Sequence, residues 1–412
     1  MTIAAAPMSF KQVLGITVMR RIWYAQIVSL LGDFLALFAV ISVVSFKLHG
    51  TAPQVTGVQI AYMLPLALLG PLAGVFVDRW PIKPTLVASD LVRAGLVLLL
   101  VLSTSLWQVY AILIALSSVS SFFAPAQSVT IRSYVPREGL LSANALMQIA
   151  MMSIRIIGPA AAGALVAAFG ATLCYAIDGV SFLASAAIIS SVIIVRPPSA
   201  AAPPSQHGRV RQVWADLAQG VNYIVHHPAL SFVVAAMAAG LFTIGCFGPL
   251  IAIFVRESLH ASAGMFGFIS AMIGVGLMAG TQGLRAVAHR LSNEAMVLSG
   301  LAGIGIGVFL LGALAYVPAT VFATFLVGFS FAAIIVPAQT LMQQETPPAL
   351  MGRISSTVMS VVFFAQVLGL VLSAVLGQML GVRAVFFLCA ALAGALAAAG
   401  HFFLASSNAA AA

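Results

Sequence analysis

The chain has 412 residues, of which 62% are hydrophobic and only 7% are charged, whereas about a quarter of the residues in an ordinary soluble domain carry a charge. Such a chain cannot cover its surface with polar groups in water, which excludes a soluble globular protein. The net charge of +9 does not indicate nucleic-acid binding, because the basic residues are spread over short connections instead of one face.

The apolar residues gather into about twelve runs of roughly twenty residues, each long enough to cross about 30 Å of hydrocarbon at about 1.5 Å per residue. The runs lie near residues 22–46, 55–77, 86–103, 107–124, 143–169, 173–195, 230–255, 264–284, 295–315, 318–340, 355–379 and 383–405. In a bilayer each run must satisfy its own backbone hydrogen bonds, which a helix does. The sequence therefore predicts an all-α membrane protein with about twelve transmembrane helices.

The basic residues around the first run indicate the orientation. Lys11, Arg20 and Arg21 precede a run that is too long for a signal peptide and has no evident cleavage site, so we expect this span to remain in the mature protein. If the ends of the runs alternate between sides, thirteen Lys and Arg residues lie on the side of the amino terminus and three on the other. The positive-inside rule then places both termini in the cytoplasm.

Two charges lie deep inside the runs. Asp33 in the first run and Arg155 in the fifth each stand eleven or twelve residues from the cytoplasmic start of the run. This spacing places both about 16–18 Å into the membrane, near its midplane. Because a charge at that depth costs at least about 2.5–3.5 kcal/mol, both residues need a reason to be there.

A short polar turn follows the second run. It places Gly74, Asp78, Arg79 and Lys83 at fixed offsets. Gly74 allows close helix packing, and Asp78 can face a helix amino terminus or an arginine. Arg79 and Lys83 can form ion pairs at a cytoplasmic gate, although a purely topology-setting role for the two cations is the alternative.

The third, fifth and sixth runs also contain notable residues. Asp90 and Arg93 share one face near the cytoplasmic end of the third run and can join the charges of the preceding turn in a gate network. Asp178 lies only a few residues inside the sixth run from the outer side. We expect water to reach Asp178 there, and a capping or packing role for it.

The fifth run contains Gly158, Pro159 and Gly163. Small residues permit a tight approach to a neighbouring helix, and proline removes one backbone hydrogen bond and bends its own helix. We therefore expect these three residues to serve helix packing instead of direct substrate contact.

A change in composition after the sixth run divides the chain. Residues 196–229 predict a cytoplasmic linker that begins with Arg196-Pro197-Pro198 and ends in a surface helix. The linker separates an amino-terminal bundle, residues 1–195, from a carboxy-terminal bundle, residues 230–412. Each bundle has six of the predicted spans.

The two halves have a faint internal repeat. Pro125-Ala126-Gln127 recurs as Pro337-Ala338-Gln339, and Gly32 and Phe34 match Gly245 and Phe247. Cys246 stands at the place in the seventh run that matches Asp33 in the first. The functional charges are therefore expected in the first half.

The segment from Gly70 to Lys83 resembles the loop signature of the major facilitator superfamily, although Pro81 stands where that family usually has glycine. Together with twelve spans and a central linker, the resemblance covers nearly the whole chain. Other segments resemble the branch that includes macrolide efflux pumps and the enterobactin exporter. They are Ser89–Ala94, Ser142–Leu146, Ile157–Gly163, Ile177–Phe182 and Gly352–Ile354.

The resemblance implies two six-helix bundles related by a pseudo-two-fold axis around a central cavity, in a bacterial inner membrane. It also implies that Asp33 and Arg155 face this cavity, where Asp33 can take up and release a proton. A structural ion pair between the two residues, or an anionic substrate held by Arg155, are the alternatives.

The implied function is proton-coupled export of a small amphipathic compound, such as a drug, a macrolide or a siderophore, by alternating access. Lysophospholipid translocation and metabolite uptake by symport are the alternative functions.

No motif of the sequence indicates an enzyme, since it has no His-Glu-x-x-His site, no Gly-x-Ser-x-Gly turn and no nucleotide-binding loop. The three cysteines, Cys174, Cys246 and Cys389, have no metal-ligand spacing, and we expect them to be small core residues. We expect no metal, no cofactor and no nucleic-acid partner. A monomer in the lipid bilayer is the expected state.

Overall fold

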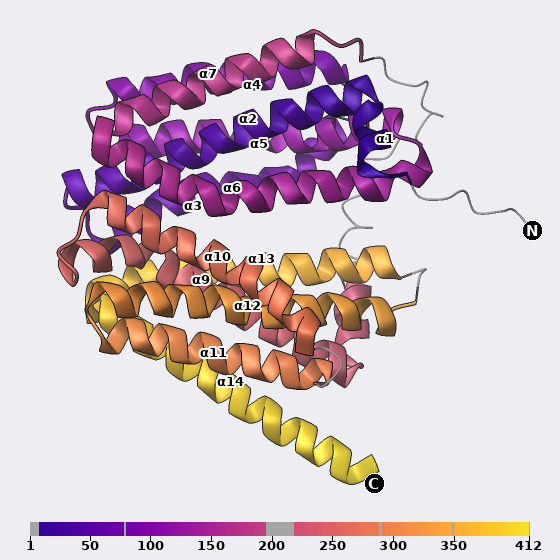
Figure 1. Cartoon of the computed structure of the whole chain (residues 1–412), viewed down its shortest axis with the longest axis vertical. Helices are drawn as coiled ribbons and strands as arrows, with labels where there is room; N and C mark the ends of the chain where they lie inside the picture. Colours follow the sequence, from indigo (N-terminus) through magenta and orange to yellow (C-terminus); the bar gives the residue numbers. More distant parts are fainter. Residues whose placement is uncertain (1–7, 78–79, 195–217, 288–290, 348–349, 412) are drawn as a thin grey trace, which may run out of the picture. The chain divides into compact units, whose positions relative to one another are not determined.

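A computed structural model describes residues 8–77, 80–194, 218–287, 291–347 and 350–411, and every regular element within these ranges is a helix. Figure 1 shows the order of the elements along the chain. Twelve helices of the described residues are long and apolar enough to cross a membrane, which confirms the predicted fold class. The composition explains this result, since only helices satisfy the backbone of single spans in lipid.

The chain divides into two compact units. Unit 1 comprises the described residues of Met1–His49, Gly57–Ala201 and Ser262–Ala271, and unit 2 comprises those of Gly50–Thr56, Ala202–Ala261 and Met272–Ala412. The helices before the linker are α1 (Phe10–Gly15), α2 (Thr17–Ser42), η1 (Val43–Lys47), α3 (Ala52–Val77), α4 (Ile82–Leu102), α5 (Leu106–Tyr134), η2 (Arg137–Gly139), α6 (Leu140–Phe169) and α7 (Ala171–Ser190).

The helices after the linker are α9 (Pro228–Glu257), α10 (Ala263–Val287), α11 (Asn293–Ala313), α12 (Val317–Glu345), α13 (Met351–Leu380) and α14 (Val382–Ala411). Residues 218–225 of the expected surface helix are helical, and residues 210–217 of that helix lie outside the described residues.

Two helices extend beyond the apolar runs that predicted them. The fourth and tenth runs were expected to end before or soon after Pro125 and Pro337, but α5 continues to Tyr134 and α12 to Glu345. Each proline removes only one backbone hydrogen bond, and the neighbouring turns keep the helix intact. The repeated Pro-Ala-Gln segments therefore lie inside helices.

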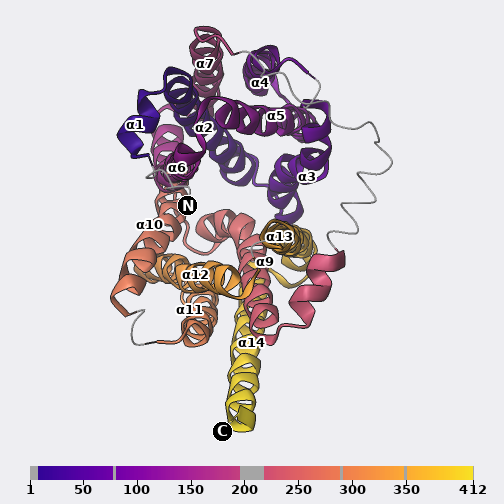
Figure 2. The same ribbon diagram turned by 90° about the vertical axis from the view of Figure 1, so that its right-hand side faces the viewer.

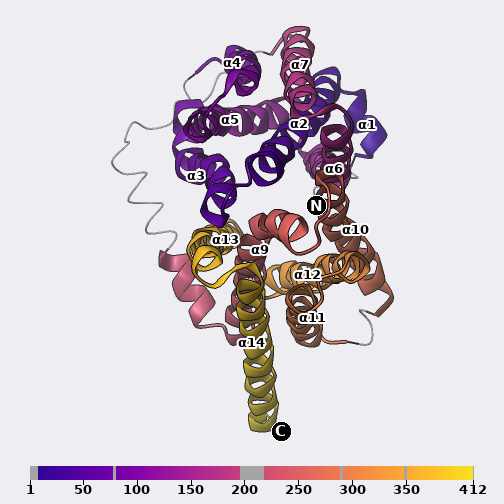
Figure 3. The same ribbon diagram turned by 90° about the vertical axis from the view of Figure 1, so that its left-hand side faces the viewer.

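The same helix pairs pack together before and after the linker. In unit 1, α2 contacts α5, α6 and α7, and α4 contacts α5 and α7. In unit 2, α9 contacts α12, α13 and α14, and α11 contacts α12 and α14. Figure 2 shows α2 among its neighbours, and Figure 3 shows α4 beside α7 from the opposite side. The faint repeat of the sequence thus corresponds to a repeated packing of five helices among the described residues.

The last helix of each half begins at an equivalent glycine. Gly170 precedes α7 with φ of +81°, and Gly381 precedes α14 with φ of +82°. Both are extended in ψ, a combination that residues with a side chain rarely adopt. These two glycines give a common reference point for comparing α7 with α14.

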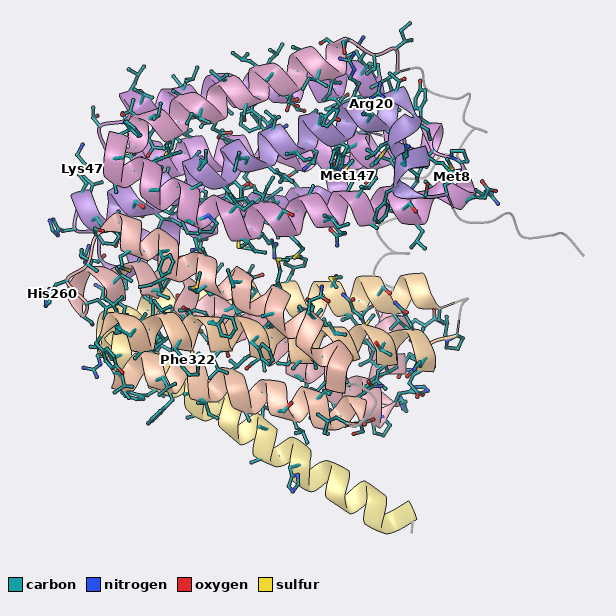
Figure 4. All side chains as sticks on the ribbon, viewed as in Figure 1. Met8, Arg20, Lys47, Met147, His260 and Phe322 are labelled. Carbon is teal, nitrogen blue, oxygen red and sulfur yellow. The ribbon has the colours of Figure 1, made fainter. Side chains whose placement is uncertain are left out.

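The central helix of unit 1 spans from one end of the unit to the other. Arg20, near the start of α2, lies at the same end of unit 1 as Met8 and Met147, and Lys47 lies at the opposite end (Figure 4). Helix α2 meets α7 closely at Gly32, where a Cβ atom would lie 2.9 Å from the Cα atom of Asp178. Only a residue without a side chain fits this contact with backbone.

We predict that Gly32→Ala lowers the stability of the protein by about 1–3 kcal/mol, the usual cost of forcing an extra methyl group into a packed core. The matched control is Gly95→Ala in α4, because a Cβ atom at Gly95 meets no atom within 4 Å. Equilibrium unfolding of the purified protein in mixed micelles measures both variants. Equal stabilities of the two variants would contradict the close contact at Gly32.

Candidate functional site

Helix α4 places an ion pair inside unit 1. Asp90 is fully buried, Arg93 is 4% exposed, and a guanidinium nitrogen of Arg93 donates to Oδ1 of Asp90. The hydroxyl group of Ser185, on α7, donates to the other oxygen of Asp90 at 2.6 Å. The carboxylate therefore has a donor on each oxygen, as a buried charge requires.

Two aromatic rings hold the guanidinium group of Arg93. Its central carbon lies 4.5 Å from the ring centre of Phe123 on α5 and 4.3 Å from that of Phe182 on α7. The Nε atom of Arg93 also donates to the carbonyl of Ser89 at 3.4 Å. A cation over an aromatic face is attracted to it, more strongly when water is absent. Arg93 is thus fixed by three helices.

Helices α2 and α3 add two further groups. Asp33, on α2, is partly exposed and interacts electrostatically with Arg93 and Asp90. Tyr62, on α3, interacts electrostatically with Asp33 and Arg93. The deep aspartate of the first span therefore belongs to the same group of charges as the ion pair of α4.

Helix α7 contributes a third carboxyl group to this region, that of Asp178. Asp178 is fully buried, so the expected access of water to it is wrong. Its Oδ1 atom accepts a hydrogen bond from the hydroxyl of Ser181 at 3.3 Å, and its Oδ2 atom has no hydrogen-bond partner among the described residues. Asp178 also interacts electrostatically with Asp33 and Arg93.

These residues form one group, which we call the polar cluster: Asp33, Asp90, Arg93, Asp178, Ser181 and Ser185. It holds three carboxyl groups and one guanidinium group, all within candidate membrane spans. The ion pair of α4 neutralises one carboxylate. Asp33 and Asp178 have no cation of their own among the described residues, so the number of protons on them decides the charge of the cluster.

Arg155 does not join the polar cluster. It lies on α6 with an exposed side chain, and no hydrogen bond, ion pair or electrostatic interaction connects it to Asp33 in the described part of the chain. The depth of a residue in its span could be counted from the sequence, but the direction of its side chain around the helix could not. The described part of the chain thus shows no direct ion pair between the two deep charges, and Arg93 is the arginine that interacts with Asp33.

The residues of the predicted gate turn are only partly described. Gly74 lies within α3, whereas Asp78 and Arg79 lie outside the described residues. The Nζ atom of Lys83 donates to the carbonyl of Ser190 at 2.8 Å, and Arg21 donates to the hydroxyl of Ser191 at 3.0 Å. Both cations thus bind the carboxy-terminal end of α7, where a positive charge is favoured by the helix dipole.

The small residues of α6 lie at helix contacts. Gly158 faces Phe34 of α2, since a Cβ atom there would lie 2.9 Å from the Cβ atom of Phe34. Gly163, one turn after Pro159, faces Gly267 of α10, whose Cα atom would lie 2.8 Å from a Cβ atom at residue 163. Both contacts belong to unit 1.

The cysteines are free and buried, as expected of core residues. Within the described residues, no group of three or more His, Cys, Asp or Glu side chains could hold a metal ion.

The sequence matches a known family over almost its whole length. Residues 8–411 match the family described as transmembrane secretion effectors. A protein from Bacillus subtilis (strain 168), named as the uncharacterised MFS-type transporter YfiS, is 28% identical over 373 residues, which cover 89% of this chain and 88% of that protein. Macrolide efflux protein A from Streptococcus pyogenes is 28% identical over 386 residues, covering 89% and 91% of the two chains.

A more distant relative and a solved structure extend the comparison. The multidrug efflux pump Tap from Mycolicibacterium fortuitum is 25% identical and covers 82% of this chain and 84% of its own. The crystal structure of the nucleoside transporter NupG superposes with a TM-score of 0.74 at 12% identity and covers 94% of this chain and 99% of its own. At that identity the likeness shows the fold alone.

We predict that Asp90→Asn destabilises the protein by about 3–5 kcal/mol, because it leaves the charge of Arg93 buried without its partner. Replacing both residues with apolar ones of similar size, Asp90→Leu with Arg93→Met, should recover most of this loss. Equilibrium unfolding in mixed micelles measures the difference.

Glu257→Gln is the matched control for Asp90→Asn. Glu257 pairs with Arg256, but its side chain is 57% exposed, so we expect a change of less than about 1 kcal/mol. Equal losses of stability in Asp90→Asn and Glu257→Gln would contradict a larger contribution of the buried ion pair to stability.

Proposed function

We propose that this chain, which belongs to the transmembrane secretion effector family of the major facilitator superfamily, exports small amphipathic compounds in exchange for protons. Membership of the family makes the chain a membrane transporter and not an enzyme. The direction, the coupling to protons and the class of cargo are the content of the proposal.

The observation that carries the coupling is the excess of carboxyl groups in the polar cluster. A charge inside the membrane costs at least about 2.5–3.5 kcal/mol, and Asp33 and Asp178 have no cation of their own among the described residues. A proton removes this cost, and its release restores it. A transporter that exposes such a group first to one side and then to the other moves protons with each cycle.

Asp33 is the group that we assign to this coupling. It is partly exposed, so a proton can reach it, and it interacts electrostatically with the fixed Arg93 and with Asp178. Any event that changes its surroundings, such as binding of cargo, changes its affinity for a proton. Binding of cargo and binding of a proton at Asp33 therefore oppose each other, and this opposition leads to the exchange of cargo for protons.

The class of cargo rests on the relatives. Macrolide efflux protein A and the multidrug efflux pump Tap are named for export of macrolides and drugs, and this chain is similar to both over most of its length. We propose a macrolide-like or other amphipathic compound as the cargo. Arg155 is exposed within a span and has no acidic partner among the described residues, so it is our candidate for contact with a polar group of the cargo.

The location follows from the charge asymmetry and from the relatives. Thirteen basic residues against three favour a cytoplasmic location for both termini, and the relatives described above are bacterial proteins. We therefore propose a bacterial cytoplasmic membrane, with Lys83 and Arg21 at the cytoplasmic ends of their helices.

We predict that proteoliposomes with an acidic interior accumulate radiolabelled erythromycin. A gradient of one pH unit corresponds to about 1.4 kcal/mol per proton, so exchange of one proton per molecule supports up to about tenfold accumulation. Asp33→Asn should abolish this accumulation, because the amide cannot bind and release a proton. Filtration and counting of the vesicles measures the retained label.

Two controls make this test decisive. Erythromycin is a weak base that gathers in acidic vesicles without a carrier, so liposomes without protein give the baseline. Glu138→Gln removes an exposed carboxyl group of η2 and should retain full accumulation. Accumulation by Asp33→Asn equal to that of the unaltered protein would refute the coupling role, and accumulation only with an alkaline interior would indicate symport.

A further inference from the structure

We propose that Asp33 and Asp178 form a carboxyl pair that holds a shared proton inside unit 1, so that Asp178 is a second proton-binding residue of the transporter. The proposal deepens the proposed function, on which its use in transport depends. The existence of the pair can be tested without any transport. The pair is inferred from the burial of Asp178, the close packing of the helices that hold both residues, and the equivalent positions in unit 2.

One carboxyl oxygen of Asp178 is unsatisfied among the described residues. This side chain is fully buried, its Oδ1 atom has only the hydroxyl of Ser181, and its Oδ2 atom has no partner among the described residues. A buried ionised carboxylate normally accepts several hydrogen bonds or pairs with a cation. A protonated carboxyl group needs less, because it is neutral and can itself donate one hydrogen bond.

Titratable and charged groups of several neighbouring helices interact with Asp178. Asp33 approaches from α2, Arg93 from α4 and Tyr62 from α3, and Cys174 and Tyr175 precede it on α7. No titratable group of α6 interacts with Asp178 in the described part of the chain. The single cation among them is Arg93.

Arg93 cannot serve all the carboxylates. It pairs with Asp90 and is held between two aromatic rings. Two ionised carboxylates at Asp33 and Asp178 would therefore leave two negative charges without a compensating cation among the described residues. Carboxyl groups that share such a place do not both ionise at neutral pH, and one of them keeps a proton.

Helices α2 and α7 pack closely next to Asp33. Gly32 immediately precedes Asp33, and α2 meets α7 there so closely that a Cβ atom at Gly32 would lie 2.9 Å from the Cα atom of Asp178. Asp33 thus follows the point of closest approach directly. The close packing of the two backbones places Asp33 and Asp178 at neighbouring levels of α2 and α7, where they interact electrostatically.

Unit 2 has positions equivalent to those of Asp33 and Asp178. Asp33 follows Gly32 as Cys246 follows Gly245, and Asp178 stands eight residues after Gly170 as Cys389 stands eight after Gly381. The thiols of Cys246 and Cys389 interact with each other and are buried, and the Cys246 thiol donates to the carbonyl of Gly369 at 3.4 Å. Equivalent positions in unit 2 are therefore in direct contact, and unit 1 has two carboxyl groups where unit 2 has two neutral thiols.

A cavity of unit 1 is lined by a residue one turn before Asp178, and we assign the route of this proton to water to that cavity. A space of about 740 Å³ in unit 1 is lined by residues at the Lys47 end of the unit, including Val40 of α2, Leu100 of α4 and Tyr175 of α7. Tyr175 precedes Asp178 by three residues, one turn of α7. When the proton leaves, the O–H bond of the carboxyl group breaks, its electron pair stays on the carboxylate, and water in the cavity accepts the proton.

Infrared difference spectroscopy of the purified full-length protein, titrated from acidic to alkaline pH in lipid, tests the pair. We expect a carbonyl stretching band of a buried protonated carboxyl group that exchanges slowly with deuterium. Asp178→Asn should remove this band, and Asp33→Asn should shift the pH at which it disappears, because it removes the neighbouring negative charge. Loss of the band in Asp178→Asn together with that shift would support the proposal.

Two variants guard against misfolding and nonspecific effects. Asp178→Cys introduces the residue type found at the equivalent position of unit 2, Cys389. This variant should also remove the band, and its unfolding transition should remain cooperative. Glu138→Gln, at an exposed position, should leave the band unchanged. A band that persists in both Asp178 variants, or an unchanged titration in Asp33→Asn, would overturn the proposal.

The outcome for the pair is separable from the outcome for export. A normal infrared result without accumulation of erythromycin would keep the pair and reject the proposed export of that compound. Accumulation driven by the pH gradient with no buried carboxyl band would keep the export and reject the pair.

Discussion

The structure depends on the cost of placing polar groups in hydrocarbon. Because lipid offers no hydrogen bonds, the backbone closes its own bonds in twelve candidate spans, and the side chains of those spans are nearly all apolar. The few charges that remain are drawn together. Asp90, Arg93, Asp33 and Asp178 come from three different helices, yet they form one cluster around Arg93, since a negative charge in a membrane span is less costly beside a cation than alone.

This constraint also explains the small residues and the serines around the cluster. Ser181 and Ser185 lie on one face of α7 and supply hydroxyl donors to the two buried carboxyl groups. Gly32 lets α2 approach α7, so that the polar groups meet without a gap between the helices. The polar face of one helix and the glycine of another are thus parts of a single arrangement, although each alone resembles an ordinary feature of a membrane helix.

The spans, the family and the position of Asp33 inside a span could be predicted from the sequence, because run length and motif spacing are local properties. The partner of Asp33 could not. Asp33 and Arg155 have the same depth, but depth does not fix the direction of a side chain around its helix, and Arg93 proved to be the nearby cation. Asp178 was assigned to the outer side with access to water because its distance from the helix end was counted, whereas its burial depends on how α2, α4 and α7 pack. The face formed by Cys174, Asp178, Ser181 and Ser185 was the available signal, since residues three or four apart share one side of a helix.

The aromatic clamp on Arg93 has a consequence for how charge can change inside unit 1. A guanidinium group held between Phe123 and Phe182, with Asp90 at its end, has no freedom to swing toward another carboxylate. The positive charge therefore acts as a fixed background field, against which ions cannot rearrange. If the proposed function holds, the charge of the polar cluster changes only when Asp33 or Asp178 gains or loses a proton.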